Sequence, residues 1–177
     1  YYHPEHQGVI IYTQNNNGET SIFYTPDDKA SGYYLLEEYA TLEVKDISPD
    51  GDWLLVVASK DRGNDPGLTL IQLRQDQTPL ILDESQAGFT TAVFSENSAT
   101  VIYTALTGDN PDDCEVRQAE VSGDQPPEVV YREAQLVDVQ WTQMHPFSTI
   151  LFIEPLETTS DRSGTPLTVL EALWRVP

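Results

Sequence analysis

A short sequence pattern that repeats at a fixed distance constrains the fold of this 177-residue chain more than any other feature. In its clearest copy, Ile47 and Ser48 end one apolar segment, residues 49–51 read Pro-Asp-Gly, and residues 53–57 begin the next apolar segment. Proline favours the first bend of a tight turn, and glycine accepts a positive φ without steric cost. The aromatic and β-branched run that follows is typical of a short buried strand. The pattern therefore predicts a strand, a tight turn and a second strand.

The same pattern returns three more times. Phe94 lies 47 residues after Ile47, Trp141 lies 47 residues after Phe94, and an earlier turn at His3–Gly8 precedes the apolar run Ile10–Thr13. Similar segments follow each copy, so a unit of four short strands is expected. The second strands are expected at Ile10–Thr13, Leu54–Ala58, Val101–Ala105 and Ile150–Ile153, the third at Thr20–Thr25, Leu68–Leu73, Cys114–Val121 and Leu167–Leu173, and the fourth at Tyr33–Glu37, Leu80–Asp83 and Val129–Arg132. Units of this length with four strands are typical of the blades of a β-propeller. The alternative, a β-sandwich of unrelated strands, does not explain the equal spacing.

The sequence therefore predicts an all-β fold, a β-propeller of about four blades with four antiparallel strands in each. Residues 1–177 are expected to form a single propeller domain, alone or as part of a larger ring. The expected blades are approximately residues 1–41, 42–88, 89–135 and 136–177. Trp53, at the start of a second strand, is expected to pack between two blades.

The terminal blades are expected to be incomplete, because only Tyr1 and Tyr2 precede the first turn and only residues 174–177 follow the last third strand. Unpaired strand edges promote association, so proteins cover them or close them. A small four-bladed ring, two chains that share one larger ring, and a partner that supplies the missing strands all satisfy this requirement. We therefore expect a processed product or a piece of a larger propeller, with a protein partner or a second copy completing the terminal blades.

The turn at Ser48–Trp53, which reads Ser-Pro-Asp-Gly-Asp-Trp, resembles the TolB-like or PD40 propeller repeat, a relative of the WD40 repeat. Only the unit at Ile47–Asp83 carries the full motif. The other units keep the strands but lose the turn, as at Ser95–Ser98. The resemblance implies a bacterial protein outside the cytoplasm, used as a binding platform or as an accessory domain of a peptidase.

The charge of the chain excludes several classes of partner. Lysine and arginine number 9 against 29 aspartate and glutamate residues, for a formal net charge of −20. Nucleic acids and anionic membrane surfaces require a basic face, so neither is an expected partner. No run of 18 apolar residues predicts insertion into a membrane. The acidic surface either resists aggregation or recognises a basic partner or calcium.

Two groups of residues could bind a metal ion. Asp109, Asn110, Asp112 and Asp113 place several hard oxygen ligands within five positions, as calcium prefers, although the spacing does not match an EF-hand loop. The alternative is a loop rich in residues that form Asx turns. The segment His3–His6, with Glu5 between its histidines, could ligate zinc, but a structural turn explains it equally well.

The sequence shows no catalytic motif and points to no cofactor apart from calcium. Gly-x-Ser-x-Gly, a glycine-rich phosphate loop and Cys-x-x-Cys are all absent. The single cysteine, Cys114, cannot form an internal disulfide and is expected to pack within a third strand. Trp174 follows the last expected third strand, where it either extends that strand or forms an exposed contact for a partner.

We therefore expect a non-catalytic β-propeller module rather than an enzyme. It would act as a protein–protein interaction platform or structural subunit in the periplasm, at the cell surface or after secretion. The alternatives are an accessory propeller domain of a hydrolase, most plausibly a peptidase, and a propeller that binds calcium or glycans.

Overall fold

The computed structural model describes residues 8–14, 17–26, 32–108, 113–134, 138–144, 147–153, 159–160 and 166–167, with side chains for 17–26, 32–108 and 113–132. Every regular element in these residues is a β-strand. The strands are β1 (Gly8–Gln14), β2 (Thr20–Pro26), β3 (Tyr33–Tyr39), β4 (Thr41–Ile47), β5 (Trp53–Ser59), β6 (Gly67–Gln72), β7 (Leu80–Glu84), β8 (Phe89–Phe94), β9 (Thr100–Leu106), β10 (Cys114–Glu120), β11 (Glu128–Ala134), β12 (Asp138–Met144), β13 (Phe147–Ile153), β14 (Thr159–Ser160) and β15 (Pro166–Leu167). No helix in the described part of the chain is long and apolar enough to cross a membrane.

The strands form antiparallel sheets in which neighbours in sequence are neighbours in space. β4 to β7 form one four-stranded sheet and β8 to β11 form another, each in the order of the chain. β1 to β3 form a three-stranded sheet, and β12 pairs with β13. The expected all-β fold with four-stranded antiparallel units is therefore confirmed. Of the third strand expected at Leu167–Leu173, only Leu167 is described, and it pairs with Thr159 of β14.

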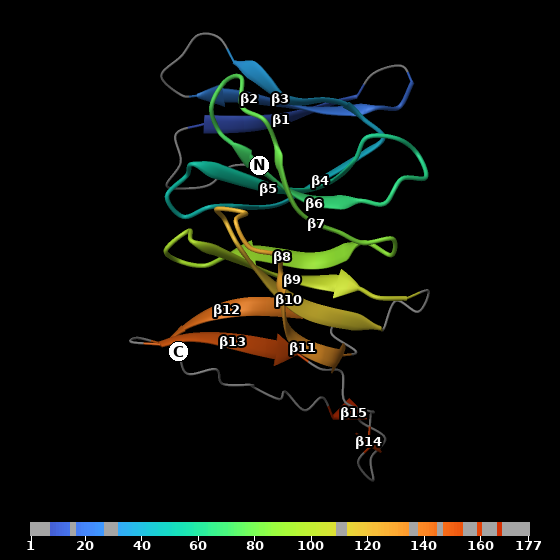
Figure 1. Cartoon of the computed structure of the whole chain (residues 1–177), viewed down its shortest axis with the longest axis vertical. Helices are drawn as coiled ribbons and strands as arrows, with labels where there is room; N and C mark the ends of the chain where they lie inside the picture. Colours follow the sequence, from blue (N-terminus) through green and yellow to red (C-terminus); the bar gives the residue numbers. More distant parts are fainter. Residues whose placement is uncertain are drawn as a thin grey trace.

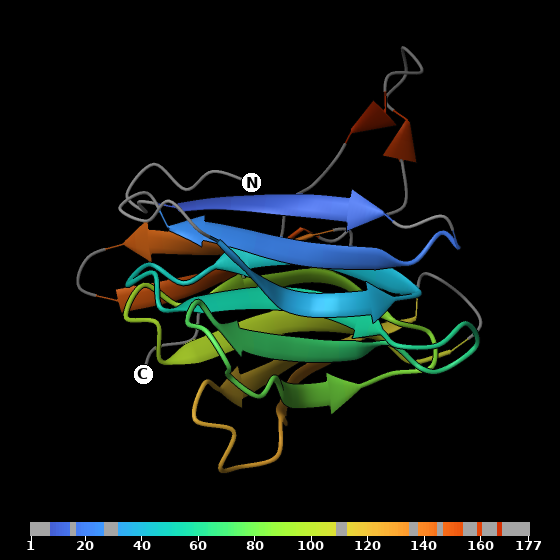
Figure 2. The same cartoon turned by 90° about the horizontal axis from the view of Figure 1, so that it is seen from above.

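The sheets stack on one another along the long axis of the molecule (Figure 1). The β1–β3 sheet lies at one end of the stack and the β12–β13 pair lies near the other end, while the four-stranded sheets lie between them. The first strands of successive units are neighbours, since β4 contacts β8 and β8 contacts β12. Figure 2 shows the same sheets from above, with the strands of successive sheets lying over one another. This arrangement gives each middle sheet two faces to bury.

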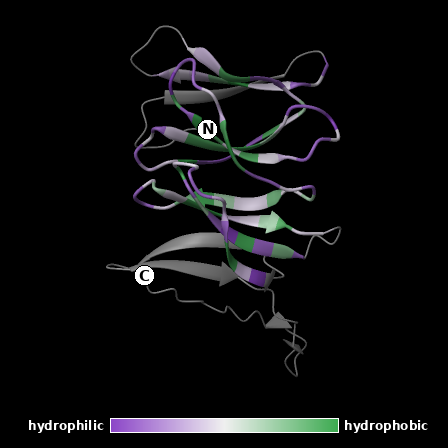
Figure 3. Ribbon diagram, viewed as in Figure 1, coloured by the Kyte–Doolittle hydropathy of each residue, from purple (hydrophilic) through white to green (hydrophobic). Residues whose placement is uncertain are grey.

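Hydrophobic residues lie mostly in the strands of the described part of the chain, whereas the loops are mostly hydrophilic (Figure 3). Leu54 and Val56 of β5 contribute to a cluster with Ile22 and Leu36 of the first sheet. The intervening residue Leu55 points the other way, into a cluster shared with the β8–β11 sheet. Leu54, Leu55 and Val56 are all 0% exposed. The continuous apolar run of β5 is therefore explained by burial on both faces of its sheet.

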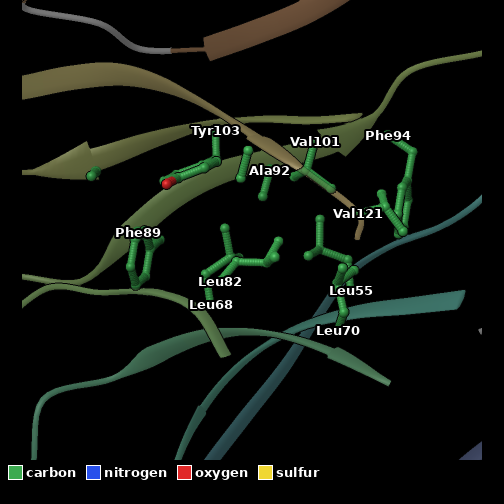
Figure 4. Close-up of a cluster of buried hydrophobic side chains, with 12 residues drawn as sticks. Leu55, Leu68, Leu70, Leu82, Phe89, Ala92, Phe94, Val101, Tyr103 and Val121 are labelled. Carbon is green, nitrogen blue, oxygen red and sulfur yellow. The ribbon is translucent and has the colours of Figure 1, made fainter. Parts of the chain in front are cut away.

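The cluster between the two four-stranded sheets contains the largest set of buried side chains (Figure 4). Leu68, Leu70 and Leu82 from one sheet face Phe89, Ala92, Phe94, Val101 and Tyr103 from the next. The rings of Phe89 and Tyr103 meet edge to face, with their centroids 5.8 Å apart. Trp53 lies at the margin of this cluster and is only partly buried, so it packs between two sheets as expected but is less enclosed than the leucines.

The Ser-Pro-Asp-Gly turn is held by its own side chains. Ser48 Oγ donates a hydrogen bond of 2.6 Å to Asp50 Oδ1 and accepts one of 2.9 Å from the backbone N–H of Trp53. Asp50 Oδ1 also accepts from the N–H of Asp52 at 3.1 Å. Gly51 has a φ of 76°, as the sequence predicts for a glycine at this position.

The turn at Ser95–Thr100 repeats these hydrogen bonds, although its sequence lacks the motif. Ser95 Oγ donates to Asn97 Oδ1 at 2.7 Å and accepts from the N–H of Thr100 at 3.0 Å. The N–H of Ala99 donates to Asn97 Oδ1 at 3.1 Å, and Ser98 takes the left-handed conformation with a φ of 57°. The expectation that this unit loses the turn is therefore wrong. Asparagine replaces aspartate as the acceptor, and serine replaces glycine at a modest conformational cost.

Replacing Leu70 with alanine should lower the free energy of unfolding by about 2–5 kcal/mol, because the change leaves a cavity between two sheets. Ile81 on the neighbouring strand is 57% exposed, so Ile81→Ala should cost less than about 1 kcal/mol. Urea denaturation of both variants measures the difference. Equal losses for the two variants would contradict the placement of Leu70 between the sheets.

The free energy of unfolding should depend on pH because of the carboxyl group of Asp50. Burial pushes its pKa upward, but hydrogen bonds from Ser48, the N–H of Asp52 and Ser98 outweigh this and hold the pKa below its ordinary value. A carboxylate with a lowered pKa stabilises the fold above its unfolded pKa, and the contribution disappears as the pH falls through the folded pKa. Asp50→Asn keeps the acceptor that Asn97 provides in the next unit. The stability advantage of the unsubstituted chain over this variant should therefore shrink between about pH 4 and pH 2 in urea denaturation. A pH-independent difference would argue against the assigned role.

Candidate functional site

The described residues that lie between second and third strands, at residues 60–66 and beside the ends of β9 and β10, lie on one side of the stack, the right-hand side in Figure 1. We call this the loop side. Ser59 Oγ donates to the carbonyl oxygens of Asp61 at 2.8 Å and Asn64 at 3.1 Å, which fixes the first loop on its strand. Arg62 Nη2 donates to the carbonyl oxygen of Asn17 at 3.3 Å and so links this loop to the neighbouring sheet.

An ionic network joins the two four-stranded sheets near the loop side. Asp83 on β7 accepts hydrogen bonds at its Oδ2 from the hydroxyl of Tyr103 on β9 and from Nη1 of Arg117 on β10, both at 2.8 Å. Glu115 Oε2 accepts from Nη2 and Nε of the same guanidinium at 2.9 and 3.1 Å. Arg132 Nη1 lies 3.5 Å from Glu115 Oε1. The guanidinium of Arg117 is thus held between carboxylates from two blades.

The environment keeps the proton on Tyr103 and on Arg117. Burial raises the pKa of the Tyr103 hydroxyl, and its hydrogen bond to Asp83 raises the pKa further. Burial would lower the pKa of Arg117, but hydrogen bonds to Asp83 and Glu115 raise it above its ordinary value. A tyrosine and an arginine that hold their protons this firmly do not exchange them near neutral pH. The network therefore acts as a clamp between blades rather than as an acid–base pair.

Two hollows open on the loop side. The smaller, of about 360 Å³, lies beside the network and is lined by Ser85, Leu106, Thr107 and Arg117. Its walls are tied together, since Ser85 Oγ donates to the carbonyl oxygen of Leu106 at 2.7 Å. The larger, of about 640 Å³, lies between the first sheet and the β4–β7 sheet. Tyr39, Lys60, Asp65, Thr69, Ile81 and Glu84 are among the side chains that line it. Its volume is in the range of ligand pockets.

The residues that the sequence indicated as metal or partner sites fall mostly outside the described residues. This applies to Asp109, Asn110, Asp112 and Trp174, and to the segment His3–His6. The calcium site and the partner contact therefore stay predictions.

Asp113 is the described member of the calcium set. Asp113 is exposed. Its backbone carbonyl oxygen accepts hydrogen bonds from the backbone N–H of Thr107 at 2.9 Å and from the Thr107 hydroxyl at 3.2 Å. Within the residues that the structure describes, no three His, Cys, Asp or Glu side chains are grouped closely enough to hold a metal ion. Cys114 is buried beside Ile102 and Val116, in line with its expected packing role.

The sequence reasoning missed the network of Asp83, Tyr103, Glu115 and Arg117. A signal was present, because Glu115 and Arg117 alternate with the apolar residues of a predicted strand and so lie on one face of it. Charged residues at that spacing, inside a blade that has neighbours on both sides, indicate an ion pair between blades. The partner carboxylate at Asp83 could not be found in this way, since it lies in the previous unit at a strand irregularity.

Removing the clamp should destabilise the chain. Arg117→Met leaves the carboxylates of Asp83 and Glu115 without their shared cation in a largely buried place, where their side chains are 14% and 15% exposed. We expect a loss of about 2–3 kcal/mol in the free energy of unfolding. Arg74→Met is the matched control, because Arg74 and Asp52 form an ion pair with 62% and 53% exposure. It should cost less than about 0.5 kcal/mol in the same urea denaturation assay. A similar loss for both variants would show that the buried network contributes nothing specific.

Comparisons with known proteins identify the fold. No family model and no curated protein sequence matches the chain. Among solved structures, the tricorn protease matches with a TM-score of 0.66 and 13% identity over 93% of this chain and 16% of that chain. TolB from Acinetobacter baumannii matches with a TM-score of 0.55 and 11% identity over 86% and 39%. A puromycin-hydrolysing peptidase from Mycobacterium tuberculosis matches with a TM-score of 0.54 and 15% identity over 94% and 31%. The chain therefore spans less than half the length of each of these proteins, and its fold is similar to that of their β-propeller domains.

Proposed function

We propose that the chain is a non-catalytic β-propeller module that mediates contacts between proteins outside the cytoplasm. In this proposal, residues 1–177 form one propeller domain, either complete or as part of a larger ring. The terminal blades are completed by a second copy or by a protein partner. Neither nucleic acid nor a membrane is a partner, in keeping with the net charge of −20.

The observation that carries this proposal is the outer face of the first sheet. Ile22 and Tyr24 of β2 point into the cluster shared with the next sheet, so the residue between them, Phe23, points to the other side. Phe23 pairs with Tyr34 on β3, and their rings meet edge to face with centroids 5.1 Å apart. Tyr34 is 49% exposed, and this sheet lies at the end of the stack (Figure 1). An aromatic pair on a terminal sheet face is suited to packing against a further sheet.

The composition of the loop side supports recognition of a protein rather than of an anionic ligand. Asp61, Asp65, Glu84 and Asp113 are exposed there. A face of one sign of charge attracts partners of the opposite sign and speeds their association. The resemblance to TolB-like propellers supports a place outside the cytoplasm.

A second candidate is an accessory propeller domain of a peptidase. The likeness to the tricorn protease and to the puromycin-hydrolysing peptidase favours it, because the chain matches a part of each. A hydrolase domain fused to or bound by this chain would support this reading. Binding of calcium or a glycan through Asp109, Asn110, Asp112 and Asp113 is a further possibility that rests on the sequence pattern alone.

The mass of the particle in solution tests the proposed function. The chain has a mass of 19.8 kDa, and we expect light scattering after size-exclusion chromatography to give a larger value, because a second copy covers Phe23 and Tyr34. Aspartate at both positions places two charges on this face, which makes burial unfavourable. The double variant Phe23→Asp with Tyr34→Asp should therefore elute as a monomer.

Ile81→Asp is the control, since Ile81 is 57% exposed, against 49% for Tyr34, but lies on another sheet. It should keep the mass of the unsubstituted chain. A monomer of 19.8 kDa for the unsubstituted chain at every concentration tested would contradict completion of the terminal blades by a second copy.

A further inference from the structure

The larger hollow on the loop side has a floor made of small side chains. Ala58, Gly67 and Thr69 come from adjacent strands of the β4–β7 sheet and face the first sheet. Tyr39 at the end of β3 forms a wall, and Ile81 on β7 lies opposite Thr69 at the open edge. The volume is about 640 Å³. The hollow is therefore a gap between two blades that opens toward solvent beside an outer strand.

The repeat shows which side chains fill the same place one blade later. Thr69 pairs with Val56 in the β4–β7 sheet, as Arg117 pairs with Tyr103 in the β8–β11 sheet. Likewise Gly67 pairs with Ala58, as Glu115 pairs with Ala105. Tyr103, Glu115 and Arg117 form the clamp between blades, whereas the matching positions at the earlier interface hold valine, glycine and threonine. The hollow is the space that the arginine and its partners occupy at the next interface.

The backbone does not forbid a larger side chain in this space. A Cβ atom at Gly67 would lie 3.5 Å from Ile81 Cγ2, 3.6 Å from Thr69 Oγ1 and 3.8 Å from the carbonyl oxygen of Ala58. These are ordinary contact distances. Larger side chains, such as those of Glu115 and Arg117, could therefore occupy this space. The sequence has small residues here instead, and they leave the hollow open.

The rim of the hollow carries carboxylates that lack a cation. Asp65 and Glu84 both line it and are exposed, and neither forms an ion pair within the residues that the structure describes. Lys60 also lines the hollow but is otherwise engaged. Its Nζ donates to the carbonyl oxygen of Glu37 at 2.7 Å and lies 4.7 Å from the centroid of the Tyr39 ring. The charge of the rim therefore favours a cation from outside the chain.

We propose that this hollow binds an arginine side chain that an extended segment of a partner protein presents. The aliphatic part of that side chain would pack on Tyr39 and Ile81, and its guanidinium would donate to Asp65 and Glu84. Arginine fits better than lysine, because its planar group donates to two carboxylates at once, as Arg117 does to Asp83 and Glu115 at the next interface.

An extended segment suits the place where the hollow opens. β7 is the outermost strand of its sheet in the described residues, so its outer edge can accept a further strand. This inference rests on the proposed function as an interaction module and names the chemistry of the partner.

A short peptide tests the inference. The probe is acetyl-Thr-Val-Arg-Val-Thr-amide with a fluorescent label, and its control replaces arginine with citrulline, which has the same shape but no charge. Fluorescence anisotropy should give a dissociation constant of about 1 mM or tighter for the arginine peptide and a value about tenfold weaker for the citrulline peptide.

Variants of the chain then test whether the peptide binds in the hollow. Thr69→Arg puts a cation in the hollow as Arg117 does at the next interface, and it should abolish binding while circular dichroism and the melting temperature show a folded chain. Glu84→Gln removes one carboxylate at the surface and should weaken binding about tenfold. Glu96→Gln is the matched control, because Glu96 is exposed on the turn at the opposite end of β9. It should leave binding unchanged.

Three results would overturn the inference. They are equal binding of the arginine and citrulline peptides, binding by folded Thr69→Arg as tight as by the unsubstituted chain, and an equal loss for Glu84→Gln and Glu96→Gln. The particle mass that tests the proposed function depends on Phe23 and Tyr34, which lie on another face. The arginine peptide can therefore fail to bind while the particle mass supports the proposed function, and the two failures can be told apart.

Discussion

The burial of both faces of each middle sheet is the constraint on which the rest of the structure depends. β5 carries Leu54, Leu55 and Val56 in succession, and all are fully buried. Because alternate residues of a strand point to opposite faces, a sheet with such a strand requires a covering layer on each side. The β1–β3 sheet supplies one layer and the β8–β11 sheet supplies the other. A stack of sheets follows directly from this pattern.

Much of the fold could be predicted from the sequence because its signals are local. Apolar runs bounded by turn residues marked the strands, and equal spacing of Ile47 and Phe94 marked the repeat. The turn at Ser95–Thr100 was not predicted, because its sequence lacks the Pro-Asp-Gly motif. Ser95 and Asn97 nevertheless form the same hydrogen bond as Ser48 and Asp50. The chemistry of an Asx turn requires an oxygen acceptor rather than a particular residue. A search for side chains that can accept these hydrogen bonds, rather than for the motif itself, would have predicted the turn.

The candidate sites were harder to predict, since they depend on contacts between units. The pairing of Asp83 with Arg117 joins residues 34 apart, and nothing in either strand alone specifies its partner. The larger hollow arises from a difference between repeats, small residues at Gly67 and Thr69 where the next unit has Glu115 and Arg117. Such a difference can be recognised only when the strand pairing in the structure shows which residues of the two units are equivalent. Loop residues such as Asp109 attracted attention because of their composition, which many solvated loops share.

The two interfaces show how one repeat can serve two purposes. Where Arg117 fills the space between blades, the interface is closed and clamped by charge. Where Thr69 takes the equivalent place, the interface is held by apolar contacts and by hydrogen bonds from Lys60 and Arg62, and it leaves room for a side chain from another protein. The same backbone geometry thus supplies a structural joint and a candidate binding place, and only a few side chains decide between them.

Native-state hydrogen exchange tests the central claim, that successive sheets are stable only because they pack on one another. The amide of Val56 in β5 and the amide of Ile102 in β9 belong to different sheets. The account predicts that both exchange only through global unfolding, with the same opening free energy, equal to the free energy of unfolding from urea denaturation. Two clearly different opening free energies would contradict it, because each sheet would then be stable without its neighbour.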